Sequence, residues 1–130
     1  MNIQDLLDRF EAFKLKGLQL NEQDIHDWLD LRDEINDTVI ELESKYLEWE
    51  AMYERDYWLR LVELKEIKLS DGKKKYTDAT ARGRCDDEFF DRRLEQIITK
   101  ETQKRLQKKA ELCEHYINAV KLYLKKNFTI

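Results

Sequence analysis

The sequence contains no proline and only three glycines, so few residues in it interrupt a helix. It also lacks any run close to the ~20 consecutive apolar residues of a membrane-spanning helix. Its first ten residues, MNIQDLLDRF, carry acids where a secretory signal has a basic flank and an apolar core. We therefore expect a cytoplasmic, non-membrane protein built from long helices.

Cysteine and histidine are scarce as well, with two of each. If Cys85 and Cys113 lie on one continuous helix, the 28 residues between them span about 42 Å at ~1.5 Å per residue. A disulfide needs Cα atoms within about 7 Å, so no intrachain bridge is expected. His26 and His115 have no nucleophile or metal ligand at a recognisable spacing. The sequence predicts no enzyme activity, metal, cofactor or small-molecule substrate.

Apolar residues at three- and four-residue steps predict three helices. The first covers residues 2–16, with Asn2 as its capping residue and Gly17 after its end. The second covers 21–68 after a cap at Asn21, and a turn over 69–77 contains Ser70-Asp71-Gly72. The third covers 78–127. The second helix contains a heptad-like seam with steps of 4, 3, 4, 3 and 4, formed by Ile35, Val39, Leu42, Tyr46, Trp49 and Tyr53.

The lengths of the two long helices predict the topology. They would span about 72 Å and 76 Å at ~1.5 Å per residue, so a short turn folds them back as an antiparallel hairpin. We expect an all-α, coiled-coil-like hairpin with a short N-terminal helix, forming one domain over residues 1–130. Because a thin two-helix layer leaves many aromatic residues uncovered, we also expect copies to associate into a homo-oligomeric bundle.

The third helix is predicted to begin with an apolar stripe, and Gly83, Tyr57 and Trp58 each have more than one interpretation. The apolar residues at the start of the third helix predict a packing stripe; they are Phe89, Phe90, Leu94, Ile97 and Ile98. Gly83 marks either a kink or a close approach of another helix. Tyr57 and Trp58 are consecutive and point in different directions, so one of them is expected off the main seam, where it is equally suited to packing or to stacking on a base.

Charge is divided unevenly along the chain. Residues 1–60 contain 16 acids and 7 bases, a net charge of −9, whereas residues 61–130 contain 12 acids and 17 bases, a net charge of +5. This separation indicates either pairing between the halves or an interaction surface on the basic half.

The basic residues of the second half are the candidate nucleic-acid site. Three consecutive lysines crowd the predicted turn, where mutual repulsion brings no structural benefit, and more cations follow along the third helix. Such a series suits phosphates, because each contact releases condensed counterions. The alternative is that these residues are solvated and paired with acids of the second helix. The candidates are Lys73, Lys74, Lys75, Arg82, Arg84, Arg92, Arg93, Lys104, Arg105 and Lys108.

The order of elements and the segment YTDATAR at residues 76–82, preceded by Asp71-Gly72-Lys73, give a family resemblance. Over about residues 21–127 the architecture resembles phage recombination mediators of the UvsY type. The resemblance implies a homo-oligomer in the host cytoplasm that binds single-stranded DNA, remodels its binding protein and loads a recombinase. It also implies a DNA-facing tip made of Lys73, Lys74, Lys75, Arg82 and Arg84. An isoelectric point of about 5.3 departs from a generally basic surface and predicts binding restricted to a patch.

The leading hypothesis is a phage-type accessory protein that binds single-stranded DNA, or a DNA-bound protein, during recombination or replication. The alternative is a protein-only interaction module, such as an assembly chaperone or an inhibitor of a host defence nuclease. In that alternative the acidic first half is the working surface.

Overall fold

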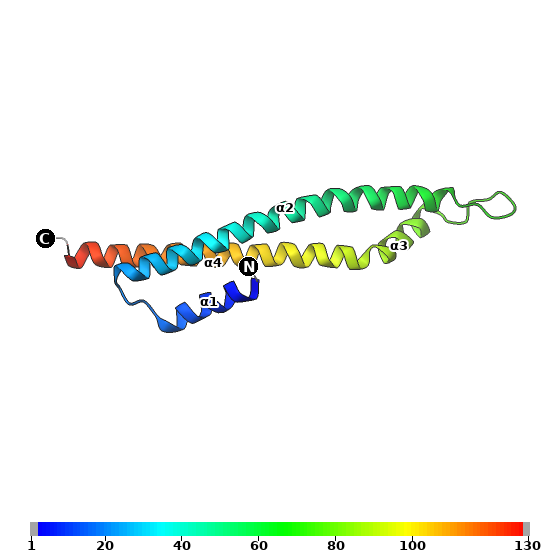
Figure 1. Ribbon diagram of the computed structural model, residues 1–130. Helices are drawn as coiled ribbons and strands as arrows, with labels where there is room; N and C mark the ends of the chain where they lie inside the picture. Colours follow the sequence, from blue (N-terminus) through cyan, green and yellow to red (C-terminus); the bar gives the residue numbers. More distant parts are fainter. Residues whose placement is uncertain (1–2, 129–130) are drawn as a thin grey trace. The chain divides into compact units, whose positions relative to one another are not determined.

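The computed structural model describes residues 3–128, and within that range it is all-helical. The elements are α1 (Ile3–Lys16), α2 (Glu22–Glu66), α3 (Asp78–Glu88) and α4 (Phe90–Phe128) (Figure 1). The predicted all-α hairpin with a short N-terminal helix is confirmed. Asn2, the predicted cap of the first helix, lies outside the described residues. The second helix begins one residue later and ends two residues earlier than predicted.

The helix ends follow local sequence signals. Gly17 adopts a φ of +76° and donates its backbone N–H to the carbonyl of Phe13 at 3.1 Å, so α1 ends at the predicted glycine. Asn21 caps α2, because its side-chain oxygen accepts the backbone N–H of Asp24 at 2.9 Å. Thr77 caps α3 in the same way, accepting the N–H of Thr80 at 3.2 Å.

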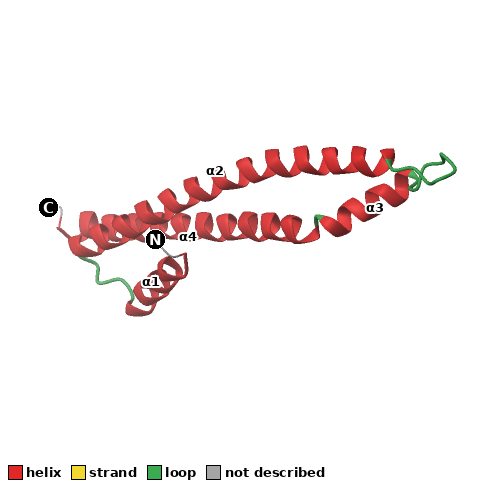
Figure 2. Ribbon diagram, turned by 45° about the vertical axis from the view of Figure 1, so that its right-hand side comes forward, coloured by secondary structure: helices red, strands yellow, loops and turns green. Residues whose placement is uncertain are grey.

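The prediction of one continuous helix over residues 78–127 is wrong, because the helix is interrupted at Phe89 between α3 and α4 (Figure 2). The Phe89 ring packs edge-on against Tyr53 at 5.7 Å and against Tyr57 at 5.6 Å. The interruption therefore coincides with tertiary packing and not with a glycine. Gly83 lies inside α3, and a Cβ at that position would meet nothing within 4 Å, so no close helix approach requires a glycine there.

The chain divides into two compact units, each containing part of α2 and part of α4. Within the described residues, the first comprises 3–43 and 101–128, and we call it the three-helix unit. The second comprises residues 44–100, and we call it the tip unit.

The three-helix unit has a continuous core, because α1 covers the adjoining parts of α2 and α4 (Figure 1). Trp28 is central to it: its ring lies 5.7 Å from that of Phe10, 5.4 Å from that of Phe13 and 4.7 Å from that of Tyr116. Ion pairs connect the same helices, including Lys109 with Glu11 at 3.2 Å. The buried core residues are Leu6, Phe10, Trp28, Leu31, Ile35, Val39, Leu106, Ala110, Cys113 and Ile117.

The predicted seam is therefore only partly a core seam. Ile35 and Val39 are buried in the three-helix unit, and Leu42 packs against that core. In the tip unit the seam continues as the half-buried Tyr46, Trp49 and Tyr53. There, cationic side chains cover two of the rings: Lys100 lies 4.9 Å from the Tyr46 ring centroid, and Lys45 lies 4.6 Å from that of Trp49.

The core of the tip unit is small. Its buried apolar residues are Leu61, Leu64, Ala81 and Cys85, with Tyr57 and Tyr76 packed against them. Within one chain most of the predicted packing stripe at the start of α4 is not buried, because only Phe89 turns inward. Phe90, Leu94, Ile97 and Ile98 are between 44% and 62% exposed. The physical reason is that nothing in this unit corresponds to α1, so these side chains are not enclosed as those of the three-helix unit are.

Candidate nucleic-acid interface

The loop after α2 is a small, hydrogen-bonded hairpin. Leu69 donates its N–H to the carbonyl of Lys73 at 2.7 Å, and Lys75 donates to Ile67 at 2.9 Å. Gly72 makes the turn with a φ of +84°, which a side-chain-bearing residue rarely adopts. The Asp71 carboxylate accepts the N–H of Lys73 at 3.0 Å. The lysines of this loop are therefore presented on an ordered backbone.

The β-hairpin loop of residues 67–75 places positively charged side chains opposite each other. Lys68 and Lys74 form an antiparallel bridge, and like charges directly opposite across such a pair are destabilising. Lys73, Lys74 and Lys75 are all exposed. Residues 65–84, which we call the basic tip, contain seven basic and three acidic residues, a net charge of +4. Sequence reasoning missed Lys68, although its position opposite Lys74 in a tight hairpin centred on Asp71 was the available signal.

Some of the predicted cations are neutralised within the molecule. Arg92 pairs with Asp56 at 3.0 Å, Arg84 with Glu88 at 3.4 Å, and Lys104 with Glu101 at 3.5 Å. Pairing across helices, the alternative interpretation, thus holds for Arg92. The other predicted cations are exposed and have no ion pair with any residue in the described range: Lys73, Lys74, Lys75, Arg82, Arg93, Arg105 and Lys108.

The structure brings part of the predicted site together. The Tyr76 ring joins the loop to α3, because Lys75 lies 5.4 Å and Arg84 lies 5.7 Å from its centroid. Arg82 is exposed on α3 in the same compact unit. The more distal predicted residues Lys104, Arg105 and Lys108 belong to the three-helix unit.

A hollow of about 380 Å³ lies at the base of the loop. It is lined by Val62, Lys65 and Glu66 of α2 and by Lys68 and Lys74 of the hairpin. The Lys65 ammonium is paired with Asp78 at 3.5 Å, and Glu66 adds one carboxylate to the lining. The two remaining ammonium groups, of Lys68 and Lys74, together with the apolar side chain of Val62, make the hollow suitable for a phosphate with an adjoining apolar surface.

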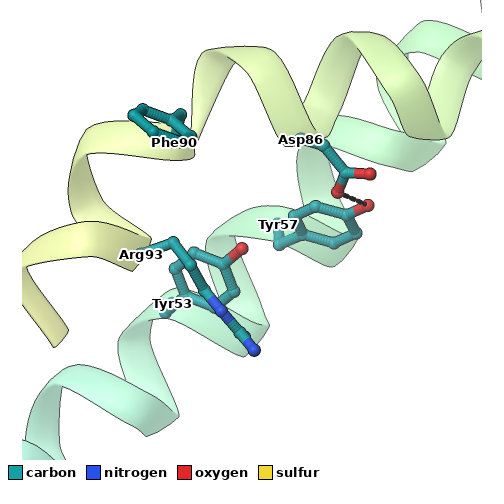
Figure 3. A pocket seen from close by; sticks show the side chains of 5 residues that line it. All are labelled: Tyr53, Tyr57, Asp86, Phe90 and Arg93. Carbon is teal, nitrogen blue, oxygen red and sulfur yellow. Dashed lines mark hydrogen bonds between the residues drawn. The ribbon is translucent and has the colours of Figure 1, made fainter. Parts of the chain in front are cut away.

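Figure 3 shows a second hollow, of about 500 Å³, which is rich in aromatic residues. Tyr53 and Tyr57 stack with centroids 5.8 Å apart, and the Arg93 guanidinium lies 5.9 Å from the Tyr53 ring. The Tyr57 hydroxyl donates to Asp86 at 2.7 Å, and this hydrogen bond raises the pKa of Tyr57 to about 12. Phe90 completes the lining. Tyr57 is thus committed to packing, and Trp58 is the exposed member of the consecutive pair.

Other charges of the tip unit form closed pairs. The hydrogen bond from Arg92, and then that from Arg55, lowers the pKa of Asp56. Arg60 lowers the pKa of Glu88 through hydrogen bonds of 2.7 and 3.0 Å. These arginines already have carboxylate partners, so they are poorer phosphate ligands than the unpaired cations of the basic tip.

The cysteines are buried free thiols in different cores, Cys85 in the tip unit and Cys113 in the three-helix unit. Because the helix between them is interrupted, the distance of about 42 Å expected from a continuous helix no longer applies. Burial raises the pKa of both thiols, that of Cys113 to about 11. Within residues 3–128 no group of three His, Cys, Asp or Glu side chains is placed to hold a metal ion, and no helix there is long and apolar enough to cross a membrane.

Comparison of the chain with protein-family models, with curated proteins and with solved structures finds no match.

Proposed function

We propose that this protein is a non-enzymatic accessory protein whose basic tip binds the phosphates of single-stranded DNA. The proposal rests on the β-bridge that sets Lys68 opposite Lys74 in the ordered loop after α2. Next to this bridge are two further exposed lysines, Lys73 and Lys75, which have no ion pair within the described residues. This arrangement costs folding free energy through like-charge repulsion. A polyanion that neutralises the lysines relieves this cost and gains from counterion release.

The acidity of the rest of the chain restricts the proposed contact to this patch. The net charge of the whole chain is −4, against +4 for residues 65–84. A strand of DNA is therefore attracted to the basic tip and repelled by the acidic first half of the chain. Binding of this kind weakens steeply as salt is added, because it depends on a small set of ionic interactions.

The biological setting in the proposal is phage recombination or replication, and it rests on the resemblance to UvsY-type mediators. In that setting the DNA-bound partner is a recombinase or a single-stranded-DNA-binding protein. The exposed acids of the first half of the chain would then be available to such a basic partner protein.

Self-association is the second part of the proposal. Phe90, Leu94, Ile97 and Ile98 follow the spacing of a helix-packing face. By helical geometry, Asp91 and Glu95 lie along one edge of this face and Arg93 and Lys100 along the other. A second copy packed in parallel would set unlike edges together, as the flanking charges of parallel coiled coils do. The occupant we propose for this face is therefore another copy of the same chain.

Charge reversal tests the DNA-binding proposal. The triple substitution Lys73→Glu, Lys74→Glu and Lys75→Glu should weaken binding to a fluorescent oligodeoxythymidylate. It should also reduce the slope of log affinity against log salt by about 0.7 for each phosphate that the variant no longer neutralises. The matched control makes the same charge change in the three-helix unit, at the exposed Lys121, Lys125 and Lys126, and should change both quantities much less.

Two outcomes would contradict the proposal. Equal losses of affinity in the tip variant and the control variant would mean that total charge, and not the basic tip, governs binding. Absence of binding by the unsubstituted protein in low salt would favour the protein-only alternative, in which the acidic half is the working surface.

A further inference from the structure

Trp58 is the most exposed of the aromatic residues on α2 of the tip unit. It is 61% exposed, and no described ring or cation lies against its indole. The other two tryptophans are engaged: Trp28 is buried among aromatic rings, and Trp49 is half-buried beneath Lys45. A free indole face on a helix surface is a large apolar area that folding has left unused.

The position of Trp58 on α2 connects it to the hollow at the base of the loop. Trp58, Val62 and Lys65 are spaced four and three residues apart, so they lie along one face of the helix. Val62, Lys65 and Glu66 line the hollow together with Lys68 and Lys74. From Trp58 to Lys65 the helix rises only about 10 Å, at ~1.5 Å per residue. The exposed indole of Trp58 therefore lies on the helix face that leads to the hollow, where Lys68 and Lys74 have no carboxylate partner within the described residues.

This combination is the one that single-stranded nucleic acid requires. Its phosphates need cations, and its unpaired bases have free faces that stack on aromatic side chains. In a duplex the bases are already stacked on one another, so a flat indole on a helix surface gains little from them. An oxyanion without a base would use the lysines and leave Trp58 uncovered.

We propose that Trp58 is a base-stacking residue, and that a single strand passes over it with its phosphates against Lys68 and Lys74 in the hollow. The inference rests on the proposed function and adds to it the residue that distinguishes a single strand from other polyanions. Stacking of one base is expected to contribute about 5- to 150-fold in affinity.

The experiment compares three fluorescent probes by anisotropy: an oligodeoxythymidylate, an abasic strand of equal length, and a duplex. Trp58→Ala should weaken binding of the oligodeoxythymidylate by at least about fivefold, and should leave binding of the abasic strand and of the duplex unchanged. Trp58→Phe should restore most of the loss, because it keeps an aromatic face. The matched control is Leu59→Ala, which removes a neighbouring side chain that is 54% exposed on a different face of α2.

Three results would overturn the inference. The first is an unchanged affinity of Trp58→Ala for the oligodeoxythymidylate, and the second is an equal loss for the abasic strand. The third is a fall in oligomer mass on light scattering that accounts for the weaker binding, which would make Trp58 a contact between copies. If instead the lysine variant binds all probes as well as the unsubstituted protein does, the proposed function fails, independently of Trp58.

Discussion

The three-helix unit and the tip unit use stretches of the same two helices but bury very different amounts of side chain. In the first, α1 covers the pair and ten residues form a buried core. In the second, no described helix covers the pair in this way, and the buried cluster has four residues. In the three-helix unit α1 therefore covers apolar side chains of α2 and α4, whereas in the tip unit many apolar side chains of the same two helices remain exposed.

The difference separates stability from recognition. Apolar burial is the dominant favourable contribution to folding. Because the larger buried cluster lies in the three-helix unit, most of this stabilisation comes from that unit. The tip unit retains exposed aromatics, an exposed apolar face on α4 and unpaired lysines. These features lower its stability and supply the groups that a ligand or another copy can contact.

The largest expected effect is on the core that α1 completes. Phe10→Ala removes a fully buried ring that contacts Trp28 and Tyr116. Loss of a buried phenylalanine typically lowers the free energy of unfolding by about 3–5 kcal/mol, and urea unfolding followed by circular dichroism measures it. The control on the same helix is Leu15→Ala. Leu15 is 87% exposed, so a change within about 0.5 kcal/mol is expected.

Equal effects of Phe10→Ala and Leu15→Ala would contradict the comparison, because α1 would then not be contributing buried surface. An unfolding transition with two phases would show that the two units unfold separately. In that case the phase affected by Phe10→Ala belongs to the three-helix unit.

The next effect concerns the exposed face of α4. Substitution of Leu94 and Ile97 by serine should lower the molecular mass measured by light scattering if copies associate through this face. Because both side chains are exposed within one chain, their removal should change the unfolding free energy of the separated chain little. The matched control is serine at Leu122, which is 67% exposed on α4 in the three-helix unit. An unchanged mass in the Leu94/Ile97 variant would exclude this face as the contact.

Periodicity predicted the helices well because helix formation is largely local. The caps at Asn21 and Thr77 and the stop at Gly17 are short-range hydrogen-bonding devices, and each is legible in a few consecutive residues. The interruption at Phe89 was not legible. It coincides with contacts to Tyr53 and Tyr57, which are more than thirty residues away in the sequence.

The candidate site was partly predictable for the same reason. The lysine run at residues 73–75 is visible as composition, and all three side chains are exposed. Lys68 required knowledge of which residues face each other across the turn. Whether Tyr57 or Trp58 is the exposed ring could not be read from the sequence, because it depends on which side chain reaches a partner on α3. Asp86 of α3 accepts a hydrogen bond from the Tyr57 hydroxyl. The inward or outward direction of Phe90 depended on whether another helix covers it.

Two glycines of the tip unit should respond in opposite directions. Gly83 lies inside α3 with open space where a Cβ would stand, so Gly83→Ala should stabilise the unit by up to about 1 kcal/mol. Gly72 has a φ of +84°, so Gly72→Ala should destabilise it by about 1–2 kcal/mol. Thermal unfolding measures both. A loss of stability in Gly83→Ala would mean that the α3 helix is not fully formed at that position.

The smallest effect is a pH dependence assigned to one hydroxyl. The hydrogen bond to Asp86 raises the pKa of Tyr57 from 10.0 to about 12. Its contribution is complete below pH 10, where Tyr57 is protonated in both the folded and the unfolded state. Between pH 10 and about 12 the unfolded state loses the proton first, so the free energy of unfolding falls as the pH rises.

Tyr57→Phe removes this hydrogen bond, at an expected cost of about 0.5 kcal/mol at neutral pH because the pair is exposed to solvent. It should also make the alkaline loss of stability shallower than in the unsubstituted protein. Cys113, whose pKa burial raises from 9.0 to about 11, adds a loss between about pH 9 and 11, but both proteins contain it and it cancels in the difference. Urea unfolding at about pH 7, 10 and 11 measures that difference. Parallel curves for the two proteins would show that the Tyr57–Asp86 contact does not hold the hydroxyl proton in the folded state.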